Sequence, residues 1–393
     1  MLINICDQTM PQNTGKNITE MLSSRGYENL RVMESKDTLK AAYENNIYRW
    51  DVRGLVVILD SIADNVLPET HIEIITLSNG VPVFETCVKA YDWLEFRNGT
   101  MTKKELEDKI SFSYNTDGNW RKLKEIRKSN PDQFKFDFII YPQIYIQNNY
   151  FDYIYEVQFN IAPAVEFSLW SGGSLTGQVI IPIYNNPHLD KEGNYVRPGF
   201  IALSQDFRLP GPVFTRLTVG KLNANRYGVD LSLTYPFKNP HWTLKMQAGY
   251  TGWTYFSDGY LTLGREFTPN FHITGSYYYS RFDLQIDVSA GKYLYDDDYG
   301  GRIDFTRHFG ETSIGVFAMY SGGEPNGGFH FAIPLPPGKR GRKHHVRILP
   351  PRYFNWEYRA RHQIPHGLTY EYSPAENRSA DYFNLLYFKN SLH

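Results

Sequence analysis

Residues 282–290 read FDLQIDVSA, and this stretch decides the fold class. Apolar and polar residues alternate through it without a break: Phe282, Leu284, Ile286, Val288 and Ala290 are interleaved with Asp283, Gln285, Asp287 and Ser289. Successive side chains of a β-strand point to opposite faces of the sheet, so the pattern predicts a strand with one apolar face and one polar face.

The same alternation recurs in segment after segment from Phe134 onward, with clusters of Gly, Pro, Asn and Asp between the segments. One run, at residues 157–169, is about 13 residues long, whereas an ordinary strand has ~5–6 residues. Tilted strands that cross a membrane need ~9–11 residues. Counting the segments predicts roughly 12–16 strands in residues 133–393, the range of closed outer-membrane barrels. We therefore predict a mainly β protein whose large domain is an antiparallel outer-membrane β-barrel, with a soluble β-sandwich as the alternative.

The composition is consistent with either β fold. The chain has 30 Tyr, 25 Phe and 7 Trp in 393 residues, and an excess of Tyr suits strand ends at a membrane–water interface. Its 41 basic and 42 acidic residues leave a net charge of -1, which argues against a nucleic-acid partner. No stretch approaches the ~20 apolar residues of a membrane-spanning helix.

The first 95 residues have a different period and predict a small α/β module. Thr14 can cap a helix that Gly26 ends, and a second helix begins near Asp51. The pair Asn79-Gly80 predicts a hairpin turn, and the expected order is α-β-β-α-β-β. Residues 96–132 are polar and charged, and we interpret them as a linker with a short helix.

Several blocks of the β region are similar to the YjbH/GfcD family. They are Arg197-Pro198-Gly199-Phe200, Gln205-Asp206-Phe207-Arg208, Phe214-Thr215-Arg216, Arg226-Tyr227-Gly228-Val229, Ala290-Gly291-Lys292-Tyr293-Leu294 and Phe331-Ala332-Ile333-Pro334-Leu335, with Asp298, Arg307, Phe309-Gly310 and Gly315-Val316-Phe317-Ala318 between the last two, and Tyr43-Glu44-Asn45 and Tyr48-Arg49 in the small module.

The resemblance implies a non-catalytic protein of the bacterial outer membrane, with its α/β module in the periplasm. It implies a role in secretion of exopolysaccharide or capsule, beside other polysaccharide-export proteins. Its expected contacts are outer-membrane lipid and polysaccharide. Members of this family usually carry two barrels, so this chain looks like the second half of such a protein or a shortened form. It begins without a secretory signal pattern and ends in Ser391-Leu392-His393 instead of an aromatic residue, although Phe383, Leu385 and Tyr387 alternate near the end.

The polar strand faces predict a hydrated lumen that contacts sugar hydroxyls, although the interior of any barrel is polar. The residues expected to line it are Glu156, Gln158, Asn160, Glu166, Lys245, Gln247, Asp283, Gln285 and Asp287. A basic run is expected to meet an anionic glycan or lipid phosphates, with a solvated loop as the alternative. It comprises Lys339, Arg340, Arg342, Lys343 and Arg347.

Motifs of catalysis, nucleotide binding and metal binding are absent from the sequence, so we predict no enzyme and no cofactor. The run from Asp296 to Asp298 lacks the spacing of an EF-hand and is interpreted as a turn. Cys6 and Cys87 are too few for a disulfide scaffold, and a mutual disulfide stays open. Two other functions remain as alternatives: a general porin or small-solute transporter, and a soluble glycan-binding β-protein.

Overall fold

The computed structural model describes residues 14–148, 155–186, 191–342, 345–360, 366–374 and 384–392. The chain is mainly β, as predicted, and divides into two units. The small unit runs to Asp132 and includes Lys339–Gly341 and Ser391–His393, and the large unit comprises Gln133–Gly338 and Arg342–Asn390. No helix in the described ranges is long and apolar enough to span a bilayer.

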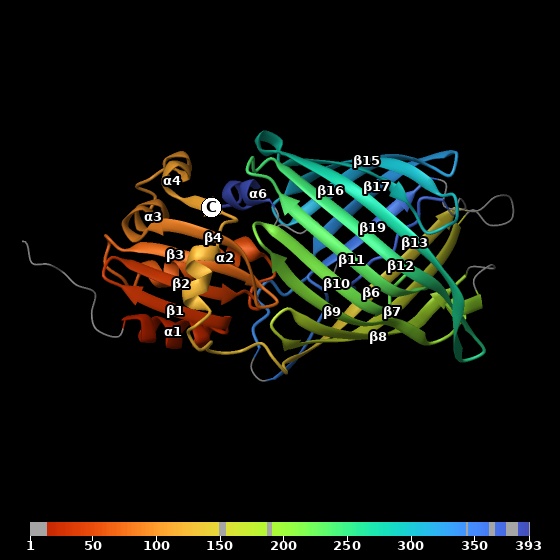
Figure 1. Cartoon of the computed structure of the whole chain (residues 1–393), viewed down its shortest axis with the longest axis horizontal. Helices are drawn as coiled ribbons and strands as arrows, with labels where there is room; N and C mark the ends of the chain where they lie inside the picture. The colour runs from red at the N-terminus through yellow and green to blue at the C-terminus, as the bar shows by residue number, and fades with distance from the viewer. Residues whose placement is uncertain are drawn as a thin grey trace, which may run out of the picture. The chain divides into compact units, whose positions relative to one another are not determined.

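The small unit begins with the predicted order α-β-β-α-β-β and continues with four further elements (Figure 1). Its elements are α1 (Thr14–Arg25), β1 (Glu28–Ser35), β2 (Thr38–Glu44), α2 (Asp51–Ala63), β3 (His71–Ser78), β4 (Val81–Lys89), α3 (Ala90–Arg97), α4 (Lys103–Lys109), β5 (Ser111–Ser113) and α5 (Asp117–Leu123). The sheet order is β1-β2-β3-β4-β5. Only β2 and β3 are parallel among these neighbours, because α2 carries the chain back between them.

Local sequence explains the helices and turns of this unit. In α2 the apolar residues Leu55, Ile58, Leu59 and Ile62 recur at helical spacing and are fully buried. Gly26 ends α1 with a φ of 101°, a left-handed conformation that suits glycine. Asn79 and Gly80 both have positive φ, 51° and 73°, as the predicted hairpin turn requires.

Residues 96–132, where we expected a polar linker with one short helix, contain α4, β5 and α5. The strand β5 extends the small sheet by pairing with β4. Leu123 at the end of α5 is buried in a cluster with Ala42, Ile75 and Leu77. The charged surface of this segment therefore covers apolar positions that complete the small unit's core.

The large unit contains one sheet whose 14 strands, counted over the described residues, lie within the predicted range of 12–16. Its elements are β6 (Phe136–Asn148), β7 (Tyr155–Trp170), β8 (Gly173–Asn185), η1 (Lys191–Asn194), β9 (Arg197–Leu209), β10 (Val213–Lys221), β11 (Arg226–Pro236), β12 (Trp242–Ser257), β13 (Tyr260–Tyr279), η2 (Ser280–Phe282), β14 (Leu284–Lys292), β15 (Tyr299–Phe309), β16 (Thr312–Ser321), β17 (Glu324–Pro334), β18 (Val346–Leu349), β19 (Tyr353–Arg359) and α6 (Leu385–Asn390).

The strands of this sheet follow one another in chain order from β6 to β17, each antiparallel to the next (Figure 1). The last two strands lie at opposite ends of the order. β18 pairs with β6 in parallel, and β19 pairs with β17 antiparallel. Only Pro350, Pro351 and Arg352 separate β18 from β19 along the chain.

The two faces of the large sheet are opposite in character, and the apolar one is the more exposed. In β16, Ile314, Val316 and Tyr320 are 52%, 56% and 59% exposed. The alternate side chains, Ser313 and Ser321 together with Phe317 and Met319, are 2–6% exposed. Other strands repeat the pattern, with Asp230 fully buried between the exposed Val229 and Leu231 of β11. A sheet that packs in water has the reverse arrangement, with its apolar face buried.

Two local predictions need correction. The strand predicted at residues 282–290 begins at Leu284, because Ser280–Phe282 form a 3-10 turn and Asp283 takes a left-handed φ of 49°. The last segment is not a strand, since α6 places Leu385, Tyr387 and Phe388 on a buried helical face. Phe383 lies outside the described residues.

Candidate functional site

The residues predicted to line a lumen lie on three strands and one turn of the large sheet. Glu156, Gln158, Asn160 and Glu166 are on β7, Lys245 and Gln247 on β12, Gln285 and Asp287 on β14, and Asp283 in the turn before β14. The structure brings together Glu156 and Gln158 at one cavity and does not bring the others there. Several of the others bind neighbours on the polar face: Gln247 donates to Asp230 at 2.8 Å, and Gln285 donates to Asp287 at 2.9 Å.

A cavity of about 270 Å³ lies among β6, β7, β8, β9, the end of β10 and the turn after β10. Most of its lining is polar: Gln143, Tyr145, Glu156, Gln158, Gln178, Arg197, Lys221, Asn223 and Asn225, beside Ile180, Pro198, Gly199, Phe200 and Ala224. Because the side chains that point to one face are every second residue, short polar segments of neighbouring strands meet here. The cavity thus combines several amides, one carboxylate and two cationic side chains.

Gln178 is the most informative side chain of this cavity. It is 3% exposed, its Oε1 atom accepts from the Phe200 backbone N–H at 3.4 Å, and its Nε2 atom has no partner in the part of the chain that the structure describes. A Cβ atom at Gly199 would lie 2.4 Å from that Oε1 atom, so glycine at this position makes room for the amide. A buried amide N–H without a partner costs free energy unless something else accepts its hydrogen bond.

The rim of the cavity is held in place by Glu192 of η1. Its carboxylate accepts from Asn225 at 2.8 Å and from the backbone N–H of Phe256 at 2.5 Å. Arg197 donates to the Glu192 backbone carbonyl at 3.0 Å. These contacts tie two cavity-lining residues to a turn and fix their directions, which is what a preformed binding site requires.

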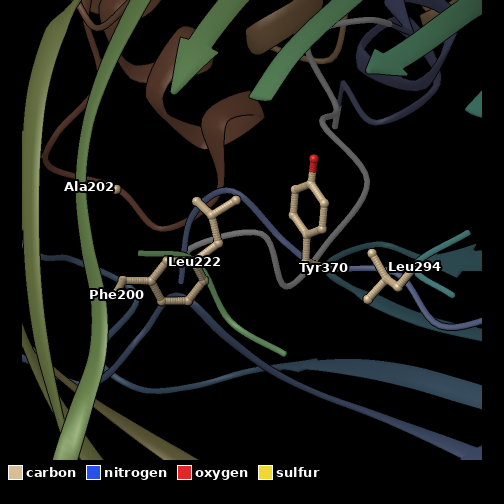
Figure 2. Packing of buried hydrophobic residues seen from close by; sticks show 5 residues of the cluster. All are labelled: Phe200, Ala202, Leu222, Leu294 and Tyr370. Carbon is tan, nitrogen blue, oxygen red and sulfur yellow. The ribbon is translucent and has the colours of Figure 1, made fainter. Parts of the chain in front are cut away.

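A segment near the C-terminus, His366–Pro374, lies on the same polar face. The Tyr370 hydroxyl donates to Asp230 at 2.7 Å and accepts from Asn270 at 3.3 Å. The Tyr370 ring is buried in an apolar cluster with Phe200, Ala202, Leu222 and Leu294 (Figure 2). Phe200 also lines the cavity, and the Glu371 N–H donates to the cavity-lining Asn223, so the segment borders the cavity.

Two arginines of the basic run, Arg342 and Arg347, have a structural role. Arg342 and Arg347 both contact the carboxylate of Asp137 on β6, at 2.6 Å each, which offsets their charge and holds β18 against β6. Arg340 is buried, and its backbone N–H donates to Ile47 in the small unit. Lys339 pairs with Tyr48 in an isolated bridge, and Lys343 lies outside the described residues.

Among the described residues there is no group of three or more His, Cys, Asp or Glu that could hold a metal ion. Cys87 forms no disulfide with a described residue, and Cys6 lies outside the described residues, so the mutual disulfide stays a prediction. Burial raises the pKa of the Cys87 thiol to about 12, which makes it a poor nucleophile.

Sequence reasoning missed three buried residues of the polar face: Gln178, Arg226 and Tyr370. Arg226 was quoted only within a family motif, yet its guanidinium is fully buried and donates to the Thr251 carbonyl at 2.6 Å and to the Thr268 hydroxyl at 2.9 Å. In the alternation of β11, Arg226 lies on the face opposite to the apolar Val229, and this pattern could have identified it as a residue of the polar face. Tyr370 had no such signal, because it lies outside any periodic segment.

The comparisons with known proteins agree with the resemblance seen in the sequence. A family model described as exopolysaccharide biosynthesis protein YbjH, of the YjbH family, matches residues 6–197. That range covers most of the small unit and the strands β6, β7 and β8 of the large unit, ending at Arg197 in the cavity wall. No curated protein matches the chain.

Proposed function

The chain belongs to the YjbH family, and from this we propose that it is a non-catalytic outer-membrane β-barrel that takes part in the export or assembly of an extracellular polysaccharide. The family's description names exopolysaccharide biosynthesis. In this proposal the large unit crosses the outer membrane, the small unit lies in the periplasm, and other polysaccharide-export proteins act beside it.

The exposed apolar face of the large sheet is the observation that carries the membrane assignment. Val316 on β16 is paired with Phe305 on one side and Phe329 on the other, and these three side chains are 56%, 40% and 41% exposed. Contiguous apolar surface of this kind is costly in water and is typical of a lipid-facing band. The buried polar side chains of the opposite face then line the interior, as in a membrane barrel.

The pairing of β18 with β6, and of β19 with β17, supports closure of the sheet. In a bilayer an open sheet edge would leave backbone N–H and C=O groups without partners. β18 supplies partners to β6 and β19 supplies partners to β17, and both belong to one short stretch of chain. In this proposal the two strands act as one, which would bring the strand order back to its start.

Membrane insertion is tested with the full chain expressed with a secretion signal. We expect it in the outer-membrane fraction after salt washing, and we expect faster gel migration before boiling than after, because a closed barrel resists detergent. Release by a salt wash, with the same mobility before and after boiling, would contradict the proposal. Deletion of the gene should lower the amount of secreted polysaccharide, and an unchanged amount would exclude the export role.

The cavity beside β7, β8 and β9 is, in this proposal, a contact site for one sugar unit of the polymer. Its amides and carboxylate match the donors and acceptors of sugar hydroxyls, and the Tyr145 ring supplies an apolar surface. Its volume of about 270 Å³ is slightly below the ~300 Å³ at which the range of ligand pockets begins, which suits a single sugar unit. Arg197 and Lys221 outnumber Glu156, so an acidic sugar is favoured over a neutral one.

Saturation-transfer NMR with glucuronate and with glucose tests this site on the detergent-solubilised chain. We expect transfer to glucuronate to exceed transfer to glucose, and Gln178→Leu to reduce it. Gln285→Leu is the matched control, because Gln285 is a similarly buried amide on β14 outside the cavity. Equal signals from wild type and Gln178→Leu would remove the cavity from the proposal.

A further inference from the structure

The segment His366–Pro374, which follows β19 in the chain, lies on the polar face of the large sheet. The turns Gly310-Glu311 and Gly322-Gly323 lie at opposite ends of β16. A Cβ atom at Gly322 would lie 2.3 Å from the His366 ring, so the segment His366–Pro374 starts beside one of these turns. The helix α6 is bonded at the other end, where the Tyr387 hydroxyl donates to the Gly310 carbonyl at 2.9 Å. The described parts of the C-terminal chain thus reach from one end of the strands to the other.

Groups from two strands and two turns hold His366–Pro374 in place. The Gly367 N–H donates to Asp298 at 2.8 Å, and Asp298 is fully buried. The Tyr370 hydroxyl binds Asp230 and Asn270, on β11 and β13, which are not neighbours in the sheet. The Glu371 N–H donates to Asn223 at 2.6 Å, beside the cavity. The segment therefore connects β11, β13 and two turns across the polar face of the large sheet.

Gly249 on β12 shows how closely the segment fits. A Cβ atom there would lie 1.9 Å from the Tyr370 hydroxyl oxygen. Any residue larger than glycine would therefore displace the Tyr370 side chain. On the neighbouring strand β13, a Cβ atom at Gly275 would have no described atom within 4 Å, so alanine is tolerated there.

We propose that His366–Pro374 is an internal plug that closes the polar path through the large unit and must be displaced for that path to open. The inference rests on the proposed barrel. Its contacts are mostly hydrogen bonds to polar groups that water or sugar hydroxyls can replace once the segment leaves. A permanent filler would instead be expected to be held by apolar packing throughout. Here Leu368 and Tyr370 join an apolar cluster and Gly367 lies against the Met319 side chain, whereas the Gly367 and Glu371 N–H groups and the Tyr370 hydroxyl are held by hydrogen bonds.

The test measures ion conductance of the full chain in planar lipid bilayers, together with swelling of liposomes in a small neutral sugar. Wild type should insert but conduct little. Gly249→Ala should raise the open probability about tenfold, since the loss of one hydrogen bond to a charged group shifts an equilibrium by at least that factor. Gly275→Ala should behave as wild type. Boiling-dependent gel migration shows for every variant that the barrel is intact.

A second variant tests the same segment in case Gly249→Ala fails to fold. Leu368→Ala with Tyr370→Ala removes both anchoring side chains from the segment and leaves every strand unchanged, and Asp230 keeps its bond to Gln247. It should also conduct. If these variants insert with intact barrels and conduct no more than wild type, the plug is overturned while the barrel stands. Failure of wild type itself to insert would overturn the proposed function and the plug together.

Discussion

The buried carboxyl group of Glu44 joins three parts of the small unit. It accepts hydrogen bonds from the Asn29 side chain at 2.5 Å and from the backbone N–H groups of Asn79 and Gly80 at 2.6 Å and 2.9 Å. Burial, and next the negative charge of Asp132, raise its pKa to about 7. A residue of the quoted motif Tyr43-Glu44-Asn45 therefore organises the hairpin turn of β3 and β4.

The stability of the small unit should depend on pH through Glu44. Its pKa in the folded chain, about 7, is above that of an unfolded chain, ~4.3. Between these values the folded state keeps a proton that the unfolded state has lost, so the free energy of unfolding should fall as the pH rises from 5 to 7 or so, by at most about 3 kcal/mol. Amide hydrogen exchange of β1 to β4 in the full chain measures it.

The matched variant for this prediction is Glu44→Gln, which keeps the size of the side chain and cannot titrate. It should lower the absolute protection, because one hydrogen-bond acceptor is lost, and should flatten the pH dependence. A pH dependence as steep as that of wild type would assign the effect to another group.

Arg226 supports the interior of the large unit. Its guanidinium binds Thr251 and Thr268 on β12 and β13 and lies over the Trp253 ring at 4.3 Å. We expect Arg226→Lys to lower the stability of the large unit by about 1–3 kcal/mol, because one ammonium group cannot make all these contacts. The temperature at which the unboiled gel band converts to the unfolded band measures this change. No shift in that temperature would show that the contacts add little.

At the scale of the element, the strands β14 and β16 show that periodicity predicts faces but not their surroundings. Alternation predicted which side chains share a face of β14, and Gln285 and Val288 lie on opposite faces, one buried and the other 54% exposed. A period of two is a property of the extended chain itself, so it can be detected locally. Which of the two faces is enclosed depends on how all strands are joined.

Val316→Arg tests what surrounds the apolar face of β16. Val316 is 56% exposed, and in water arginine at such a position usually changes stability by no more than ~0.5 kcal/mol. Against lipid the same change costs on the order of 2–4 kcal/mol near the midplane. We therefore expect Val316→Arg to reduce assembly in the outer membrane, measured as the heat-modifiable fraction, and Val316→Ile to leave it unchanged. Normal assembly of Val316→Arg would place this face in water.

At the scale of the whole molecule, the boundary of the small unit depends on packing that composition conceals. Residues 96–132 are charged enough to suggest a linker, yet β5 pairs with β4 and Leu123 completes an apolar cluster. A charged segment can belong to the core with few apolar residues, because each of them is buried against residues of the rest of the unit.

Two fragments should differ for this reason. Residues 1–132 should give a cooperative thermal unfolding transition by circular dichroism. Residues 1–95, which lack β5 and α5, should be less stable because Ala42, Ile75 and Leu77 lose the cover that Leu123 supplies. Equal melting temperatures for the two fragments would show that the segment adds nothing to the core.

The sequence by itself determined the first two helices, several of the strands, the Asn79-Gly80 turn, the strand count within its predicted range, and the family. These features arise from short-range periods and turn chemistry, which need no knowledge of distant residues. Only the tertiary structure decided that Gln178, Glu156 and Asn223 share one cavity and that Tyr370 reaches Asp230, 140 residues earlier in the chain. Such contacts depend on strand register and on the return of the chain along the sheet, and a segment without a repeating pattern carries no local signal of its destination.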